Sequence, residues 1–190
     1  PILDMDPAHG QLREPLLKVM HLMRAMEFES KDGREVALEW MEDKLGQMAF
    51  ESPSVFSFFL PEFAPDGPVA QAGLVAPEAQ LATAPYLVGY LNGISSLLDN
   101  GLSYCGGGFG GDRRGLSCYG KELVKSSSEG TLQFAPKAPS TPSKVIDELA
   151  LLLTGGRMSM QTRTVLLATY TDIVAESPFD MSAAVAKLKS

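Results

Sequence analysis

The chain has 190 residues, of which 45% are hydrophobic and 21% are charged, and its formal net charge is -7. A chain of this size and composition can bury a sizeable core, so we expect most of it to fold. The acidic balance without a segregated basic patch argues against a nucleic-acid partner, and the absence of an 18-residue apolar run argues against a membrane-spanning helix.

Apolar residues recur at helical spacing in two successive segments near the N-terminus. The first runs from Gln11 to Glu29 and the second from Ala37 to Met48, with an Asp-Gly turn between them. We expect two amphipathic helices that pack antiparallel. Five methionines fall on their apolar faces: Met20, Met23, Met26, Met41 and Met48. Such a stripe forms either core or an adaptable surface for partners.

The stretch from Ser52 to Pro85, termed the strap, is apolar but lacks helical periodicity. Its prolines at 53, 61, 65, 68 and 77 rule out one long helix. Its apolar side chains would form a large exposed patch if left in solvent, so we expect them to anchor the strap to a helical core. The candidate anchoring and interaction residues are Phe56, Phe58, Phe59, Leu60 and Phe63.

A third helix is expected from Thr83, a capping residue, to the Asn100-Gly101 pair. Its predicted buried stripe consists of Leu87, Leu91, Ile94 and Leu98. The following residues, 103–120, read as a loop that continues through the serines at 126–128, with a short strand at 131–134. Residues 102–142 are therefore predicted to be a loop-rich insert.

The C-terminal part reads as a helical hairpin. One helix begins at Thr141-Pro142 with Val145, Ile146, Leu149, Leu152 and Leu153 inside. A Gly155-Gly156 turn follows, then a helix capped by Ser159 that carries Tyr170, and a last short helix from Asp180 to Leu188. The prediction is a mainly α fold, an irregular helical domain of about five to seven helices with long Pro- and Gly-rich crossings and little or no sheet. We expect residues 1–190 to form one domain of a longer precursor.

The run CGGGFGGDRRG formally matches a dinucleotide-binding pattern through Gly106, Gly108 and Gly111. That pattern needs a strand before it and a helix after it, whereas here a helix precedes and more loop follows. A mobile loop held by a disulfide is the alternative. Cys105 and Cys118 bracket the loop and either bond to each other or remain two buried thiols.

The sequence carries no strong catalytic or metal-binding signature. Asp4, Asp6 and His9 can gather a cation weakly or form a solvated segment, and the spacings typical of zinc sites do not occur. No G-x-S-x-G motif marks a nucleophile, although a hydrolase is not excluded. We therefore predict no catalytic residues, no cofactor and no metal.

Three sequence words carry a family resemblance: SPSVFSFFLPEF, AGLVAPEAQLATAP and LLTGGRMSMQTR. They resemble the C-terminal half of the bacterial and algal "domain of unknown function 1800" family, and LREPLLKVMHLMRAM resembles the segment before them, so the likeness runs from Leu12 to about Tyr170. The resemblance implies a helix-rich and usually exported protein without established catalytic residues.

Two functions are expected from these observations. The first is a non-enzymatic structural or interaction protein that docks on other proteins of a larger assembly, with membrane association only peripheral and through partners. The alternative is an extracellular hydrolase or carbohydrate-active domain whose catalytic residues lie mostly outside this chain. An exported, periplasmic, extracellular or organelle-lumenal location is favoured over the cytoplasm.

Overall fold

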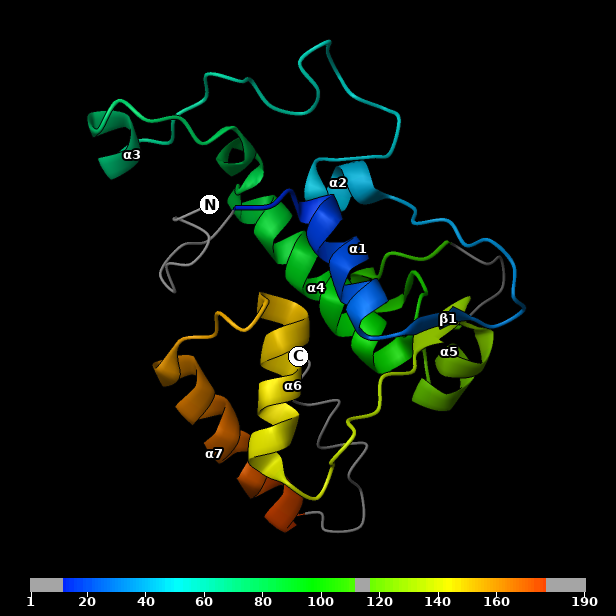
Figure 1. Cartoon of the computed structure of the whole chain (residues 1–190). Helices are drawn as coiled ribbons and strands as arrows, with labels where there is room; N and C mark the ends of the chain where they lie inside the picture. Colours follow the sequence, from blue (N-terminus) through cyan, green and yellow to red (C-terminus); the bar gives the residue numbers. More distant parts are fainter. Residues whose placement is uncertain (1–11, 112–116, 177–190) are drawn as a thin grey trace. The chain divides into compact units, whose positions relative to one another are not determined.

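The computed structural model describes residues 12–111 and 117–176, and these are mainly helical (Figure 1). The α-helices of this part are α1 (Pro15–Ala25), α2 (Met41–Leu45), α3 (Pro68–Gln71), α4 (Ala84–Asn100), α5 (Lys121–Ser127), α6 (Pro142–Thr154) and α7 (Met160–Glu176). Two 3-10 helices, η2 (Pro77–Leu81) and η3 (Cys105–Gly107), accompany one two-stranded sheet of β1 (Phe28–Ser30) and β2 (Gly130–Leu132). The predicted mainly α fold with little sheet is confirmed.

Two compact units divide the chain. The described part of the first comprises residues 21–28 and 132–176, and that of the second comprises residues 12–20, 29–111 and 117–131. A single domain over residues 1–190 and a longer precursor stay predictions.

Helix α4 organises the second unit, where it packs against α2, η3 and α5. Its contact face combines glycines with the buried Ser96 and Leu97. A Cβ at Gly89 would lie 2.3 Å from the Lys44 carbonyl oxygen of α2, and a Cβ at Gly93 would lie 2.0 Å from the Phe109 ring. Small side chains let the neighbouring backbone and the aromatic ring come close to the helix axis, so this face is the core of the unit.

The predicted buried stripe of α4 is wrong, although the helix itself is confirmed. Leu87 and Leu91 are 50% and 63% exposed, while Ile94 and Leu98 are half-buried. The packed side instead holds Gly93, Ser96 and Leu97, and Leu87 and Leu91 lie outward. Thr83 is the N-cap residue, but its side chain makes no capping hydrogen bond within the described chain.

The two predicted N-terminal helices are shorter than expected. Helix α1 ends at Ala25 because Glu27 adopts a left-handed backbone (φ 54°) and the chain continues into β1. Left-handed residues also precede and follow α2, at Trp40 (φ 61°) and Gly46 (φ 72°), which limits it to one turn. The predicted second helix over 37–48 is therefore confirmed only at Met41–Leu45, and its antiparallel packing against α1 stays a prediction.

The methionines of the two predicted stripes lie inward. Met23, Met26 and Met41 are buried, whereas Met20 and Met48 are half-buried. This burial favours the core interpretation over a surface for partners.

The first unit contains the predicted hairpin of α6 and α7, which is confirmed. Buried Val145, Ile146 and Leu149 line α6, and Leu152 and Leu153 are half-buried. Gly155 ends α6 with φ 61°, and the Ser159 hydroxyl accepts a hydrogen bond of 3.0 Å from the Thr162 N–H at the start of α7.

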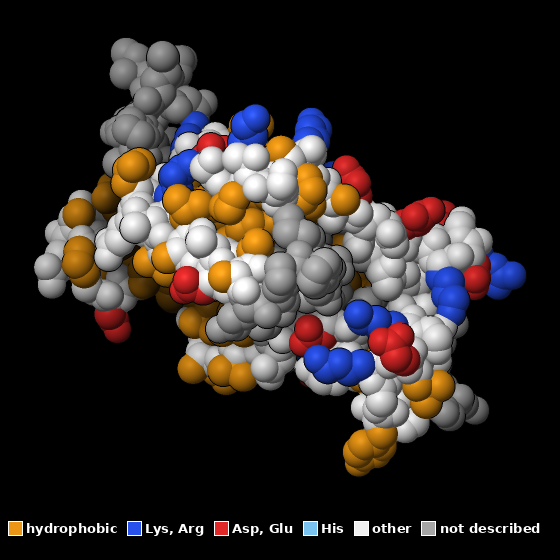
Figure 2. Space-filling view, turned by 90° about the horizontal axis from the view of Figure 1, so that it is seen from below, with side chains coloured by type: hydrophobic (Ala, Val, Ile, Leu, Met, Phe, Trp, Pro, Cys, Tyr) orange, Lys and Arg blue, Asp and Glu red, His pale blue; other side chains and the backbone are white. Residues whose placement is uncertain are grey.

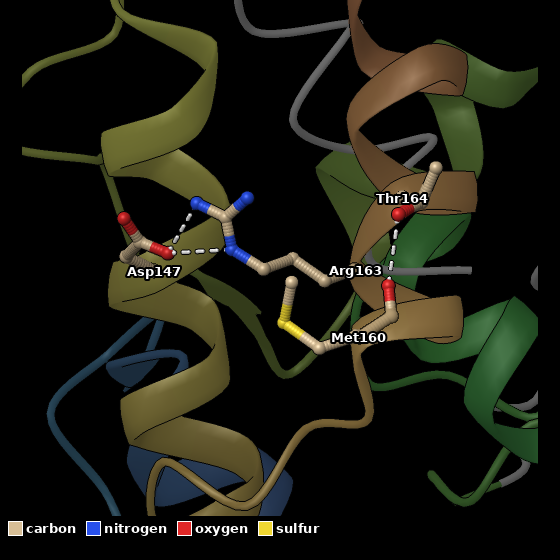
Figure 3. A network of polar contacts seen from close by, with 4 residues as sticks. All are labelled: Asp147, Met160, Arg163 and Thr164. Carbon is tan, nitrogen blue, oxygen red and sulfur yellow. Dashed lines mark hydrogen bonds and ion pairs between the residues drawn. The ribbon is translucent and has the colours of Figure 1, made fainter.

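Polar contacts also join this hairpin. The Tyr170 hydroxyl donates to the Pro139 carbonyl at 3.1 Å, and Arg163 pairs with Asp147 at 2.7 Å (Figure 3). The predicted last helix from Asp180 to Leu188 lies outside the described residues.

Candidate functional site

The strap forms a tied loop within the second unit. Residues 52–67 contain no helix or strand but several turns, of which the first has a bridge between Ser54 and Ser57. Further along, the Leu60 N–H donates to Gln80 Oε1 and the Ala76 N–H donates to the Phe63 carbonyl, both at 2.8 Å. These bonds join the two arms of the strap, and the loop between them carries α3 (Figure 1).

The prediction that the strap aromatics anchor to a core is wrong. Phe56 and Leu60 are exposed, and Phe58, Phe59 and Phe63 are only half-buried. The physical reason is the tight turn at 54–57, which presents its two central side chains to solvent. The buried anchor of the strap is instead Leu81 of η2, immediately before α4.

Exposed large hydrophobic side chains occur in many places of the described chain, and three groups of them lie in or near the strap and on α4. At the turn, Val55 is 94% exposed and Phe56 is 55% exposed, and Phe50 just before the strap is fully exposed. The second group is Leu74-Val75, and the third is the outward face of α4 with Leu87, Val88 and Leu91. Sequence analysis did not identify Leu74 and Val75 as exposed, because the AGLVAP segment has no periodicity that separates buried from exposed positions. Hydrophobic side chains also stand exposed among charged ones on the face shown in Figure 2.

Residues 103–111 and 117–120 are irregular as predicted, apart from the short η3, but the glycine-rich segment 101–111 is packed into the fold. Phe109 is 1% exposed, and Leu102 and Cys105 are buried with it. The Gly110 N–H donates to the Ser103 carbonyl at 3.0 Å, and the Glu39 N–H donates to the Phe109 carbonyl at 2.8 Å. Helix α5 replaces part of the predicted loop at 126–128.

The glycines of the formal nucleotide-binding pattern face the protein's own atoms. A Cβ at Gly108 would lie 2.2 Å from the Ser103 carbonyl oxygen, and one at Gly111 would lie 2.6 Å from a Glu39 carboxylate oxygen. In a phosphate-binding loop, such glycines give the ligand close access to the backbone. Here they allow close internal packing.

Cys105 and Cys118 lie at disulfide distance, with their sulfur atoms 2.07 Å apart and their Cα atoms 5.4 Å apart. Cys105 is buried in η3, whereas Cys118 is exposed. The alternative of two separate buried thiols does not fit this geometry.

The Lys44 side chain has a shifted pKa, and its role is structural. Burial lowers the pKa of its ammonium group, while Asp43 and Glu42 act in the opposite direction. Its Nζ donates to the Gly108 carbonyl oxygen. This side chain therefore fastens the glycine-rich segment to α2.

A polar hollow of about 420 Å³ lies beside β1. It is lined by Ser30, Asp32, Arg34, Glu35, Val36, Ala37 and Glu129. The lining includes three carboxylates and one guanidinium group, a net negative set that disfavours an anionic ligand.

Metal and membrane signals are weak in the part of the chain that the structure describes. No three His, Cys, Asp or Glu side chains gather there as metal ligands, and no helix there is long and apolar enough to cross a membrane. The candidate cation ligands Asp4, Asp6 and His9 lie outside the described residues.

A family model described as "Protein of unknown function (DUF1800)" matches residues 3–188. The chain belongs to this family. Searches among curated proteins and among solved structures gave no match. The DUF1800 match confirms the resemblance in sequence and extends it over nearly the whole chain, but the description of the DUF1800 family assigns no activity to any residue.

Proposed function

We propose that this DUF1800 chain is a non-enzymatic structural or interaction protein that docks on another protein of a larger assembly. The observation that carries the proposal is the exposed apolar turn of the strap, where Val55 and Phe56 face solvent, and Phe50, five residues before Val55 in the chain, is exposed as well. Exposed apolar side chains that gather on a surface are typical of interaction sites.

The proposed occupant is an apolar groove on a partner protein. A lipid bilayer is a poorer match because the strap around the turn is irregular, and its backbone groups find hydrogen-bond partners in a protein groove but not in hydrocarbon. The net charge of -7 also disfavours anionic lipid headgroups. A protein groove satisfies both the apolar side chains and the polar backbone.

The proposed location is an oxidising compartment, either exported or lumenal. The support is the pairing of Cys105 with Cys118, since disulfides persist outside the reducing cytosol.

Native complexes test the docking proposal. The chain, tagged and expressed in its own source, would be separated by size from a native extract, with wild type compared with a Val55→Ser, Phe56→Ser double variant. We expect wild type in a high-mass fraction and the double variant mainly as monomer. Val165→Ser is the matched control, because Val165 is an exposed valine on α7, in the other compact unit.

Three results would contradict the proposal. A wild-type chain that migrates as a monomer has no stable partner, and a double variant that stays in the complex docks elsewhere. Self-association of the purified chain in light scattering would indicate a second copy as the occupant. Hydrolysis or glycan binding by a longer precursor, lost when its other parts are removed, would favour the alternative of a hydrolase or carbohydrate-active protein.

A further inference from the structure

The Cys105–Cys118 bond joins two very different environments. Cys105 is 3% exposed and lies in η3, whereas Cys118 is exposed and lies three residues before α5. One sulfur of the pair therefore belongs to the packed core of the second unit, and the other belongs to a surface segment.

The Cys105 end is held by contacts that do not depend on the disulfide. The Cys105 carbonyl accepts from the Ser96 hydroxyl and from the Gly108 N–H. Phe109 is buried against Gly93, and Lys44 reaches the Gly108 carbonyl. This segment has enough internal packing to stay in place when the bond is broken.

The Cys118 end has far less to hold it. Tyr119 is 88% exposed, Gly120 takes a positive φ of 91°, and the first buried side chain of α5 is Val124. The first turn of α5 depends on hydrogen bonds from the Leu123 and Val124 N–H groups to the Gly120 carbonyl, both 3.1 Å long. The disulfide is the covalent tie between η3 and the segment just before α5, while α5 itself packs against α4.

We propose that this disulfide is a redox-sensitive latch for the start of α5. Reduction releases residues 117–120 and the first turn of α5, while the segment 101–111 remains packed. The inference is independent of the docking role of the strap.

The reaction requires a dithiol reductant. One thiolate of the reductant attacks the accessible Cys118 Sγ, so a mixed disulfide forms and the Cys105 sulfur leaves as a thiolate, which takes a proton because its site is buried. The second thiolate of the reductant then attacks the mixed disulfide and releases Cys118. The protein gains two electrons and two protons, and the reductant becomes a disulfide.

Hydrogen exchange followed by mass spectrometry tests the latch on the intact chain, with and without dithiothreitol. We expect exchange of the peptide that holds the Leu123 and Val124 amides to accelerate about tenfold or more on reduction, since the cross-link no longer limits local opening. The peptide with the Gly108 and Gly110 amides should keep its protection. Reoxidation should restore the original rates.

A Cys118→Ser variant without reductant should match the reduced wild type, because Cys118 is exposed and serine leaves the core unchanged. Unchanged exchange in α5 on reduction would overturn the proposal, as would loss of protection in both peptides together. Free alkylation of both thiols in the unreduced protein would overturn it as well.

Discussion

The ring of Phe109 occupies the space beside α4 that a side chain at Gly93 would need, with only 2.0 Å between a Cβ there and Phe109 Cζ. Phe109 comes from a glycine-rich segment and Gly93 from the middle of a helix. The contact thereby joins two features that look unrelated in sequence. One is the glycine-rich segment, and the other is a glycine in the middle of helix α4.

We expect Gly93→Ala to lower the free energy of unfolding by about 1–3 kcal/mol. Alanine normally gains up to about 1 kcal/mol over glycine inside a helix, but here the added methyl group forces the Phe109 ring out of position. Urea denaturation measures the change. Ser95→Ala is the control, since Ser95 is an exposed residue of the same helix. An equal or higher stability of Gly93→Ala would show that the ring is free to move.

The same contact predicts coupling between the two positions. Phe109→Leu should cost less in a Gly93→Ala background than in wild type, because the smaller side chain makes room for the new methyl group. A double-mutant cycle from urea denaturation gives the coupling energy, which we expect to be about 0.5–3 kcal/mol. If the stability changes of the two substitutions simply add, that result would argue against a direct contact between the two positions.

Two buried serines near this contact should respond in opposite ways to replacement by alanine. The Ser96 hydroxyl donates to the Cys105 carbonyl, whereas the Ser103 hydroxyl has no hydrogen-bond partner in the described part of the chain. Ser96→Ala should therefore cost about 1 kcal/mol, and Ser103→Ala should leave stability unchanged or raise it by about 1 kcal/mol. Thermal unfolding of both variants checks this, and a large loss for Ser103→Ala would contradict it.

Stability in alkali should depend on Tyr170. Burial raises the pKa of its phenol above the ordinary value of 10.0. The unfolded chain thus loses this proton at a lower pH than the folded chain, so the stabilisation is complete below pH 10 and disappears as pH rises through the folded pKa. Wild type should exceed Tyr170→Phe in Tm at pH 8, and the difference should shrink toward pH 11.

A constant Tm difference across that pH range would contradict the Tyr170 prediction. Lys44, whose pKa is lowered by burial, contributes with the opposite sign. It is present in both chains, so comparing them at each pH removes its effect.

The ion pair between Asp147 and Arg163 should contribute little. The Asp147 side chain is 59% exposed, and solvent screens pairs of this kind. Asp147→Asn should cost about 0.2–1 kcal/mol in urea denaturation, with a smaller effect in 1 M salt. Asp172→Asn is the control for the loss of charge, because Asp172 is an exposed acid on α7. A cost that is independent of salt would point to packing instead.

The sequence predicted those elements whose local signals agree with their packing. Helix α6 has Pro142 at its start, Gly155 at its end and buried Val145 on its inner face. Its end residues and its periodicity therefore predict the same helix. Helix α4 shows the opposite case. Its leucines form the strongest stripe, yet the buried side is marked by Gly89 and Gly93, and small residues carry almost no periodic signal.

Sequence analysis identified the strap but predicted the wrong burial for its side chains. Apolar composition identified the strap, and the assumption that apolar residues seek a core placed Phe56 inside. Whether a side chain such as Phe56 is buried depends on what lies opposite it in the fold, and no local pattern contains that information. The same limit applies to Phe109, whose burial depends on a distant glycine.

The carbonyl of Met26, at the end of α1, accepts hydrogen bonds from the Gln133 and Phe134 N–H groups at 3.1 and 3.0 Å, over a long sequence separation. During synthesis, this early residue cannot complete its contacts until more than 100 further residues have left the ribosome. These backbone hydrogen bonds therefore form late in synthesis, and non-local pairing of this kind slows folding.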